Sequence, residues 1–279
     1  MTAIDIDTLQ DWVGTEETLT DCVRESAVRQ FRYTLEDYLV DADQEIVPPG
    51  FHWTLFQPMV PSVDLGEDGH PRSLGLLPEM PMSSRMWAGG DVVFRSPLGI
   101  GDEVVRHTKV DRIEEKAGGS GTLIFVTLSH EIEVRGRAHI SETQTLVYRN
   151  PGMPAGRGLP GREQGTGRPF RADSVMLFRY SALTFNSHRI HYDRSYAQDV
   201  ENYPDLVVHG PLQATLLIND VAASLGHSRI GFSYRGALPL YVDETAYLCR
   251  TGGGAGEAWV ERASGDVTMK SRFTPVSKS

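Results

Sequence analysis

The chain has 279 residues, 40% of them hydrophobic, which is enough to fill one large core or two domains of about 100–150 residues each. A formal net charge of −10 argues against general nucleic-acid binding, which needs a concentrated basic surface. The two cysteines, Cys22 and Cys249, lie far apart and in no metal-ligand spacing, which argues against a disulfide framework and against a zinc site. Residues 1–17 are acidic and polar, and no long apolar run follows, so we expect a cytoplasmic protein without a signal peptide or membrane span.

The first half combines one expected helix with one expected antiparallel sheet. Apolar side chains recur at helical spacing across residues 16–40, which predicts a helix there. Four stretches rich in β-branched and aromatic residues predict strands at 91–96, 103–115, 122–134 and 139–149. Residues 151–169 are rich in glycine and proline, which is typical of a linker. We therefore expect an N-terminal domain at 1–150, a linker at 151–170 and a C-terminal domain at 171–279.

The second half is expected to wrap a sheet around a helix. Its pattern predicts a strand at 174–185, a helix at 194–201, a long helix at 211–225, and strands at 231–238, 243–250, 256–263 and 266–274. The long helix is apolar or small nearly all round, so other elements must cover most of its surface. An α+β hot-dog fold, in which a curved antiparallel sheet grips one buried helix, satisfies this requirement.

A short internal repeat suggests that this unit is duplicated. The segment from Phe94 to Glu103 is similar to the segment from Tyr234 to Glu244, and strands with glycine-rich turns follow each copy. A match this short also arises by chance. Taken as a duplication, it predicts a double hot dog, with two antiparallel sheets that each wrap a long central helix.

Reactive side chains concentrate between residues 184 and 193, where the chain passes from a predicted strand to a predicted helix. This segment holds an amide, two imidazoles and a carboxylate, and histidine is the usual acid/base group near neutral pH. About twenty residues later, Gly210 and Pro211 open the long helix. The free N–H groups and positive dipole of a helix start stabilise an anion such as a thioester enolate.

The run Phe178–Leu217 resembles the mesaconyl-CoA and itaconyl-CoA hydratases and the fungal mitochondrial 3-hydroxyacyl-thioester dehydratases of type two. It is more distantly similar to the R-specific enoyl-CoA hydratases of the MaoC-like group. The segments Pro48–Pro58 and Met82–Gly90 extend the likeness into the first half. The resemblance implies a double hot-dog fold, thioesters of CoA or acyl-carrier protein as substrates, and neither metal nor redox cofactor.

The resemblance also assigns catalytic residues. The wider group has an aspartate, then an asparagine, then a histidine five residues after the aspartate that opens an H-x-D motif. His191 matches that histidine, but Asn186 stands at the aspartate position and His188 at the asparagine position. Water activation by a carboxylate is therefore in doubt, and Asn186, His188 or Asp193 could take over that role. The family's backbone oxyanion donor corresponds to Gly210.

Other positions are candidates for substrate contacts. Arg85 could bind the free carboxylate of a dicarboxylic acyl group through two parallel hydrogen bonds, or could be an ordinary surface arginine. Asp193 is better suited to cap the helix that follows it than to transfer a proton, although the two roles can coexist. His188 could instead fix the loop or pair with Asp193, and for His209 we favour a turn-forming role over catalysis. We expect no metal site here, because the usual ligand spacings are missing. The residues predicted to bind substrate are Arg85, Trp87, Arg189, Asp193 and His209.

The sequence thus predicts a hydro-lyase that adds water to a small unsaturated dicarboxylyl-CoA, such as mesaconyl-C4-CoA, itaconyl-CoA or 3-methylfumaryl-CoA. The alternatives are a 3-hydroxyacyl-thioester dehydratase of fatty-acid type, a hot-dog thioesterase and a non-catalytic acyl-CoA binding module. The expected partner is the acyl-CoA substrate, with no cofactor, no nucleic acid and no membrane. Because hot-dog folds commonly pair, we also expect a homodimer.

Overall fold

The computed structural model describes residues 6–39, 46–73, 75–78, 80, 82, 84–118, 121–150 and 167–277. Its helices are α1 (Ile6–Gln10), α2 (Glu25–Leu35), α3 (Ser174–Thr184), α4 (Arg194–Asp199) and α5 (Gly210–Leu225), with 3-10 turns η1 (Glu36–Tyr38), η2 (Phe51–Thr54), η3 (Ser62–Asp64) and η4 (Arg189–His191). Its strands are β1 (Glu16–Cys22), β2 (Ser84–Phe94), β3 (Glu103–Gly118), β4 (Gly121–Val134), β5 (Arg137–Arg149), β6 (Arg168–Arg171), β7 (Ile230–Gly236), β8 (Thr245–Arg250), β9 (Gly256–Arg262) and β10 (Val267–Pro275).

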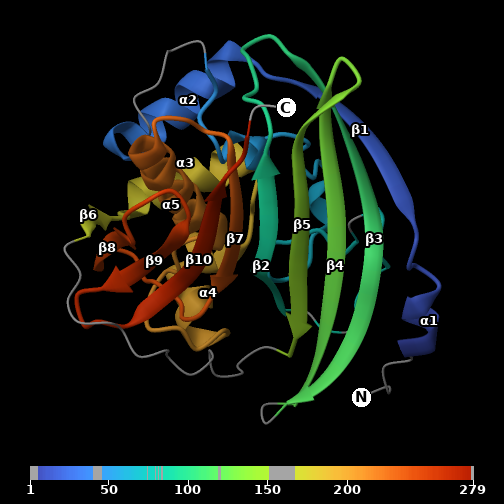
Figure 1. The fold of residues 1–279 in the computed structure, drawn as a ribbon. Helices are drawn as coiled ribbons and strands as arrows, with labels where there is room; N and C mark the ends of the chain where they lie inside the picture. The colour runs from blue at the N-terminus through green and yellow to red at the C-terminus, as the bar shows by residue number, and fades with distance from the viewer. Residues whose placement is uncertain are drawn as a thin grey trace.

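The strands form one continuous antiparallel sheet in the order β1-β3-β4-β5-β2-β7-β10-β9-β8-β6 (Figure 1). The order of the second half mirrors that of the first, and β2 and β7 meet in the centre. The predicted repeat relates Phe94 to Tyr234, so Phe232 is the counterpart of Val92. These two residues pair directly across the central seam, the line along which β2 pairs with β7. A local two-fold relation between the halves therefore passes through this pair, and the α+β double hot-dog fold is confirmed.

The two halves differ in what their sheets enclose. In the second half the sheet packs around α5, which is buried continuously from Leu212 to Asn219, as its apolar sequence predicts. Within the described part of the first half, the longest helix is α2, and it packs against α3 instead of filling its own sheet. The two predicted sheets are thus joined into one, and within the described residues a long central helix is present only in the C-terminal half.

The N-terminal prediction is wrong for residues 16–22, which form edge strand β1 paired with β3. Alternating threonines at 18 and 20 favour an extended chain, and the helix begins only at Glu25. Apolar spacing alone had merged the strand and the helix into one element.

Residues 174–184 form helix α3, where a strand was predicted. Asp173 caps it by accepting a hydrogen bond from the Met176 N–H at 2.8 Å. The helix buries Leu177, Tyr180 and Ser181, at helical spacing. An apolar run of this length fits either element, and the cap is the signal that distinguishes them.

The remaining predicted elements are confirmed, with bounds that differ by a few residues except at β2, which begins at Ser84 instead of 91. Most of the predicted linker, residues 151–166, lies outside the described residues, whereas Arg168–Arg171 form β6 at the sheet edge. None of the described helices is both long enough and apolar enough to cross a membrane.

Candidate active site

A cavity of about 1270 Å³ lies between the halves. The first half contributes side chains from β3, β4 and β5, and the second half contributes the 186–191 segment and the start of α5. The first-half sheet therefore faces an open space, in contrast to the sheet that packs on α5. The predicted residues in the cavity wall are Arg85, Trp87, Asn186, His188, His191 and Gly210, whereas Arg189, Asp193 and His209 are not among the lining residues.

His191 lies in η4 with its ring buried against the backbone. Its Nδ1 is 2.6 Å from the carbonyl oxygen of Val207. A carbonyl only accepts, so Nδ1 carries the hydrogen and the Nε2 of the neutral ring keeps its lone pair. Burial lowers the pKa of His191 to about 4, although the hydrogen bond to Val207 opposes the shift. The ring is thus a neutral base at physiological pH.

His209 positions His191. The two rings stack with their centroids 3.7 Å apart and an interplanar angle of 21°, and the Oγ of Ser181 lies 2.8 Å from the Nε2 of His209. His209 is almost completely buried, so it sits behind His191 and not in the cavity wall. This placement supports a structural role close to the site over direct substrate contact.

Gly210 opens α5 beside the indole of Trp87. A Cβ at this position would lie 2.8 Å from Trp87 Cε3, so only glycine permits this close approach. Among the described residues, the N–H of Gly210 has no hydrogen-bond partner. Since Gly210 lines the same cavity as His191, its N–H and the positive end of the α5 dipole are available to a developing anion there.

Asn186 and His188 also belong to the cavity wall. The Oδ1 of Asn186 accepts a hydrogen bond from the backbone N–H of His188 at 3.0 Å, so part of this amide holds the loop in shape. The His188 ring lies edge-on to His191, with 5.4 Å between centroids. Burial, then the charges of His70 and His191, lower the pKa of His188 well below its usual value. Its Nε2 is buried without a partner among the described residues.

Arg189 and Asp193 are engaged with each other. Asp193 Oδ2 accepts hydrogen bonds from Arg189 Nε at 3.1 Å and from Nη2 at 2.7 Å. Asp193 Oδ1 accepts from the Tyr196 N–H at 3.1 Å, which confirms that Asp193 caps α4. The alternative pairing of Asp193 with His188 is wrong, because Arg189 occupies that carboxylate. Neither side chain is placed to contact a ligand in the cavity.

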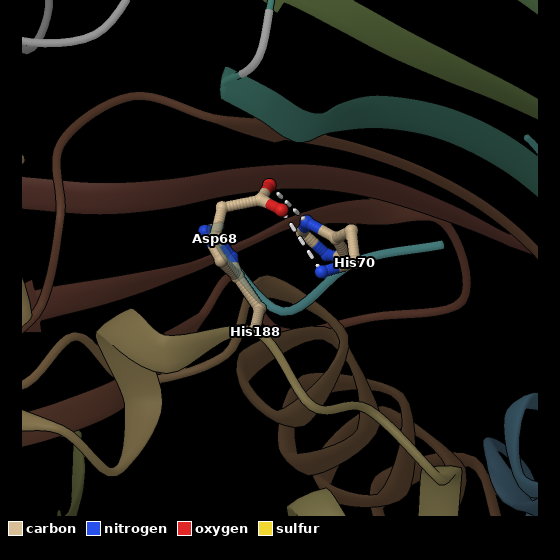
Figure 2. Close-up of side chains that lie close together, drawn as sticks. All are labelled: Asp68, His70 and His188. Carbon is tan, nitrogen blue, oxygen red and sulfur yellow. Dashed lines mark hydrogen bonds and ion pairs between the residues drawn. The ribbon is translucent and has the colours of Figure 1, made fainter. Parts of the chain in front are cut away.

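Sequence reasoning missed a carboxylate and an imidazole that reach the site from the first half. Figure 2 shows the Asp68 carboxylate turned toward His70, close to His188. Asp68 Oδ2 lies 2.9 Å from His70 Nδ1, and Oδ1 accepts from the His70 backbone N–H at 2.9 Å. His70 in turn lies 4.1 Å from His188 between ring centroids. The only sequence signal is the short spacing of Asp68 and His70, since nothing in the sequence connects them with residues near 188.

These three side chains are the group of described residues best placed to hold a metal ion. One potential ligand atom from each lies within 4.8 Å of the other two. That spacing is wide for a closed site with bonds of about 2.0–2.2 Å, and the carboxylate already accepts a hydrogen bond from the imidazole. The arrangement resembles a carboxylate–histidine pair more closely than a set of metal ligands.

A second buried carboxylate lies in the first-half wall. Glu142 Oε1 accepts hydrogen bonds from Trp53 Nε1 and Tyr234 Oη at 3.0 Å each, and Oε2 lies 3.4 Å from His52 Nε2. Burial alone would raise the pKa of Glu142, but the hydrogen bonds and positive charge around it lower the value to about 2. Glu142 is therefore a fixed anion that anchors the aromatic wall of the cavity.

Comparison with known proteins agrees with this geometry. A family model described as hydroxyacyl-thioester dehydratase type 2 matches residues 50–242. The chain belongs to this family. The chain is also similar to a mesaconyl-C(4)-CoA hydratase from Chloroflexus aurantiacus, 39% identical over 82% of this chain and 84% of that protein. A mitochondrial hydroxyacyl-thioester dehydratase type 2 from Schizosaccharomyces pombe is 25% identical over 89% of this chain and 94% of its own length.

Solved structures support the fold of this family member. HtdX from Mycobacterium tuberculosis superposes with a TM-score of 0.72 at 16% identity and covers 93% of this chain and 99% of its own. A conserved hypothetical protein from the same organism, described as a double hotdog fold, gives a TM-score of 0.60 at 11% identity over 94% of this chain and 95% of its own. With hydratases and dehydratases as relatives, the protein is a lyase of the hydratase/dehydratase type.

Proposed function

We propose that the protein adds water across the double bond of a small unsaturated dicarboxylyl-CoA, such as mesaconyl-C4-CoA, itaconyl-CoA or 3-methylfumaryl-CoA. The observation that carries this proposal is the shared cavity, in which the basic imidazole of His191 and the unpaired N–H of Gly210 both lie in the wall. The relative that is a mesaconyl-C(4)-CoA hydratase supports the choice of acyl group.

In this proposal, catalysis is acid–base chemistry combined with stabilisation of an enolate. His191 either takes a proton from the attacking water or returns it to the α-carbon, while the Gly210 N–H and the α5 dipole hold the enolate oxygen. Water addition changes no oxidation state overall, so the reaction needs no redox cofactor. We propose that it also uses no resident metal, because His191 and the Gly210 N–H supply the acid–base chemistry and the stabilisation of the enolate. In the reverse direction, the same groups would catalyse dehydration of a 3-hydroxyacyl thioester.

Arg85 is the proposed partner of the substrate's free carboxylate. It projects from β2 into the cavity wall, and its positive charge lowers the pKa of both His70 and His188, so it lies close to the imidazoles. Burial raises the pKa of Tyr148, and the charge and hydrogen bond of Arg85 oppose that shift. A guanidinium held beside the reacting groups would bind a carboxylate on the acyl chain, not the distant CoA moiety.

The first prediction tests His191 in the hydration of a panel of unsaturated acyl-CoAs, followed by loss of the conjugated-thioester absorbance. We expect the His191→Ala variant to lose about 10²–10⁴-fold in rate, the usual contribution of a general acid/base group, while its circular dichroism remains native. The control is His107→Gln, because His107 is half-exposed on β3. An unchanged rate in His191→Ala would remove this residue from the mechanism.

The second prediction concerns acyl-chain selectivity. Replacement of Arg85 by Ala should raise KM for dicarboxylyl-CoAs and leave monocarboxylyl-CoAs nearly unaffected, because only the former lose a charge-assisted pair. Arg189→Ala is the matched control, since Arg189 pairs with Asp193 and is not a lining residue. If the ratio of kcat/KM between the two substrate classes does not change, Arg85 does not bind the free carboxylate of the substrate.

The thioesterase alternative finds little support on α5. Asp220 is the acidic residue of this helix, and its Oδ2 accepts a hydrogen bond from Arg250 Nε at 2.9 Å, away from the cavity wall. Gln213 does line the cavity, but its Oε1 accepts from Thr268 Oγ1 at 2.7 Å. A thiol-reactive dye included in the hydration assay detects any release of free CoA.

We further propose a cytoplasmic homodimer. The similarity to a bacterial mesaconyl-C(4)-CoA hydratase supports the cytoplasmic location, and the tendency of hot-dog folds to pair supports the dimer. Light scattering coupled to size-exclusion chromatography measures the mass of the assembly.

A further inference from the structure

The second half lacks the carboxylate expected beside the catalytic histidine, because that position is Asn186. The first half brings Asp68 and His70 to the same region. Asp68 is buried and holds His70 by two hydrogen bonds, one to the ring and one to the backbone. Since the carboxylate accepts the Nδ1 hydrogen, the Nε2 of a neutral His70 keeps its lone pair. His70 lines the cavity, whereas Asp68 sits behind it.

The loop that carries this pair is fixed against the catalytic segment. Ser187 Oγ donates a hydrogen bond to the Gly69 carbonyl oxygen at 2.5 Å, and the Arg189 N–H donates to the Asp68 carbonyl oxygen at 2.8 Å. Gly69 has a φ of +88°, and a Cβ there would lie 2.0 Å from the Ser187 carbonyl oxygen. Glycine is therefore required at the point of closest approach, and the docked loop holds the His70 ring 4.1 Å from the His188 ring, measured between centroids.

The groups around His70 suit a base that becomes charged only during turnover. Asp68 faces it from its own loop, Arg85 from β2, and His188 and His191 from the 186–191 segment. Burial, then the charges of Arg85 and His191, lower the pKa of His70 well below its usual value, so the resting imidazole is neutral. When His70 gains a proton, the Asp68 carboxylate stabilises the imidazolium, as in a histidine–aspartate pair of a hydrolase.

We propose that His70, oriented by Asp68, is the base that takes the proton from the attacking water and so replaces the carboxylate absent at Asn186. This assignment rests on the hydratase activity proposed above. The water oxygen bonds to the β-carbon as one of its protons moves to His70 Nε2, and the electron pair of the double bond moves into the thioester as an enolate at Gly210. His70 then releases its proton to solvent in the cavity, and His191 Nε2, which lines the same cavity, takes a proton from solvent and delivers it to the α-carbon, so both imidazoles end neutral.

This assignment separates two steps that can be measured independently with a 3-hydroxyacyl-CoA in D₂O. NMR follows exchange of the α-hydrogen, which needs His191, and absorbance follows loss of water, which needs His70 as well. We expect His70→Gln to lower kcat for water loss by about 10²–10⁴-fold with little change in KM, and to retain α-hydrogen exchange. His191→Gln should lose both reactions, and His107→Gln neither.

Asp68 is a positioning residue in this scheme, so its test is a pH profile. Because the carboxylate stabilises protonated His70, Asp68→Asn should lower kcat and move the acidic limb of the kcat profile to lower pH. Asp64→Asn, an exposed carboxylate in η3 of the same segment, is the matched control and should leave the profile unchanged.

The outcomes distinguish the two levels of the proposal. If the wild-type protein leaves every thioester intact, the hydratase function is wrong and the His70 assignment with it. If the wild-type protein turns over substrate and His70→Gln retains water loss, or loses exchange and water loss equally, only the His70 assignment is overturned. Activity that is abolished by a chelator and restored by a divalent cation would also overturn it, because Asp68, His70 and His188 would then hold a metal.

Discussion

At the scale of single residues, the site is built from imidazoles that burial keeps neutral. Desolvation is the largest cause of the lowered pKa of His70, His188, His191 and His209, and the mutual repulsion of their charged forms adds to it for three of the four. Neutral rings are available as bases at physiological pH, and they spare the core a cluster of uncompensated positive charges.

The third prediction follows from this neutrality. Unfolded His191 binds a proton near its usual pKa, whereas the folded ring binds one only near about 4, so the unfolded state holds more protons between these values. The neutral His191 ring contributes fully to the free energy of unfolding above the unfolded pKa of about 6.5. This contribution, of order 3 kcal/mol, is lost as pH falls toward the folded pKa. Urea unfolding across this range should show a shallower pH dependence in His191→Gln than in the wild type. Equal slopes would contradict a neutral buried ring.

At the scale of elements, the start of α5 determines the geometry of the site. Proline follows Gly210 in the first turn, where its missing N–H costs nothing, and the glycine allows Trp87 to pack on the backbone. Trp87 is itself held by Tyr234, stacked at 4.3 Å between centroids, and by Trp53, edge-on at 5.5 Å. Trp87 and its aromatic neighbours therefore connect the start of α5 to one wall of the cavity and to the central strands.

The fourth prediction concerns this contact. A methyl group at position 210 would overlap Trp87, which packs against Tyr234 and Trp53. Gly210→Ala should therefore cost about 1–3 kcal/mol of stability and also lower kcat/KM. The control is Gly254→Ala, where the nearest atom to an added Cβ is 3.9 Å away. Thermal unfolding and the hydration assay measure both effects. A variant with native stability and rate would show that the helix start tolerates displacement.

At the scale of the whole molecule, pairing of β2 with β7 joins the two halves into one sheet and leaves the first-half sheet free to line a cavity (Figure 1). The groups proposed to act in catalysis or to bind substrate then come from both halves, since His191 and Gly210 belong to one and Arg85 and His70 to the other. An enzyme built this way needs an intact seam for activity as well as for stability.

The fifth prediction tests the seam. At Gly90 an added Cβ would lie 2.1 Å from the Thr143 carbonyl oxygen and 2.6 Å from Tyr234 Oη, so Gly90→Ala must separate β2 from β5 or β7. We expect a loss of at least about 2 kcal/mol and a lower Tm, with activity falling in parallel. Gly252→Ala, which meets no atom within 4 Å, should match the wild type in both measurements. Unchanged unfolding of Gly90→Ala would show that the seam adjusts without cost.

The sequence by itself determined the elements with strong local signals: the fully apolar helix α5, the strands β3 to β5 and β7 to β10, and the segment around His191 and Gly210. These follow from periodicity, turn residues and short motifs, all of which act between near neighbours in the chain. It misassigned residues 16–22 and 174–184, where short apolar runs fit either element and pairing or capping decides.

Only the tertiary structure decided which residues share the cavity. It separated Arg189 and Asp193 from the cavity wall by pairing them, placed His209 behind His191, and brought Asp68 and His70 to His188 across more than a hundred residues of chain. Contacts of this kind depend on how whole strands and loops dock, and no local pattern in the sequence encodes that docking.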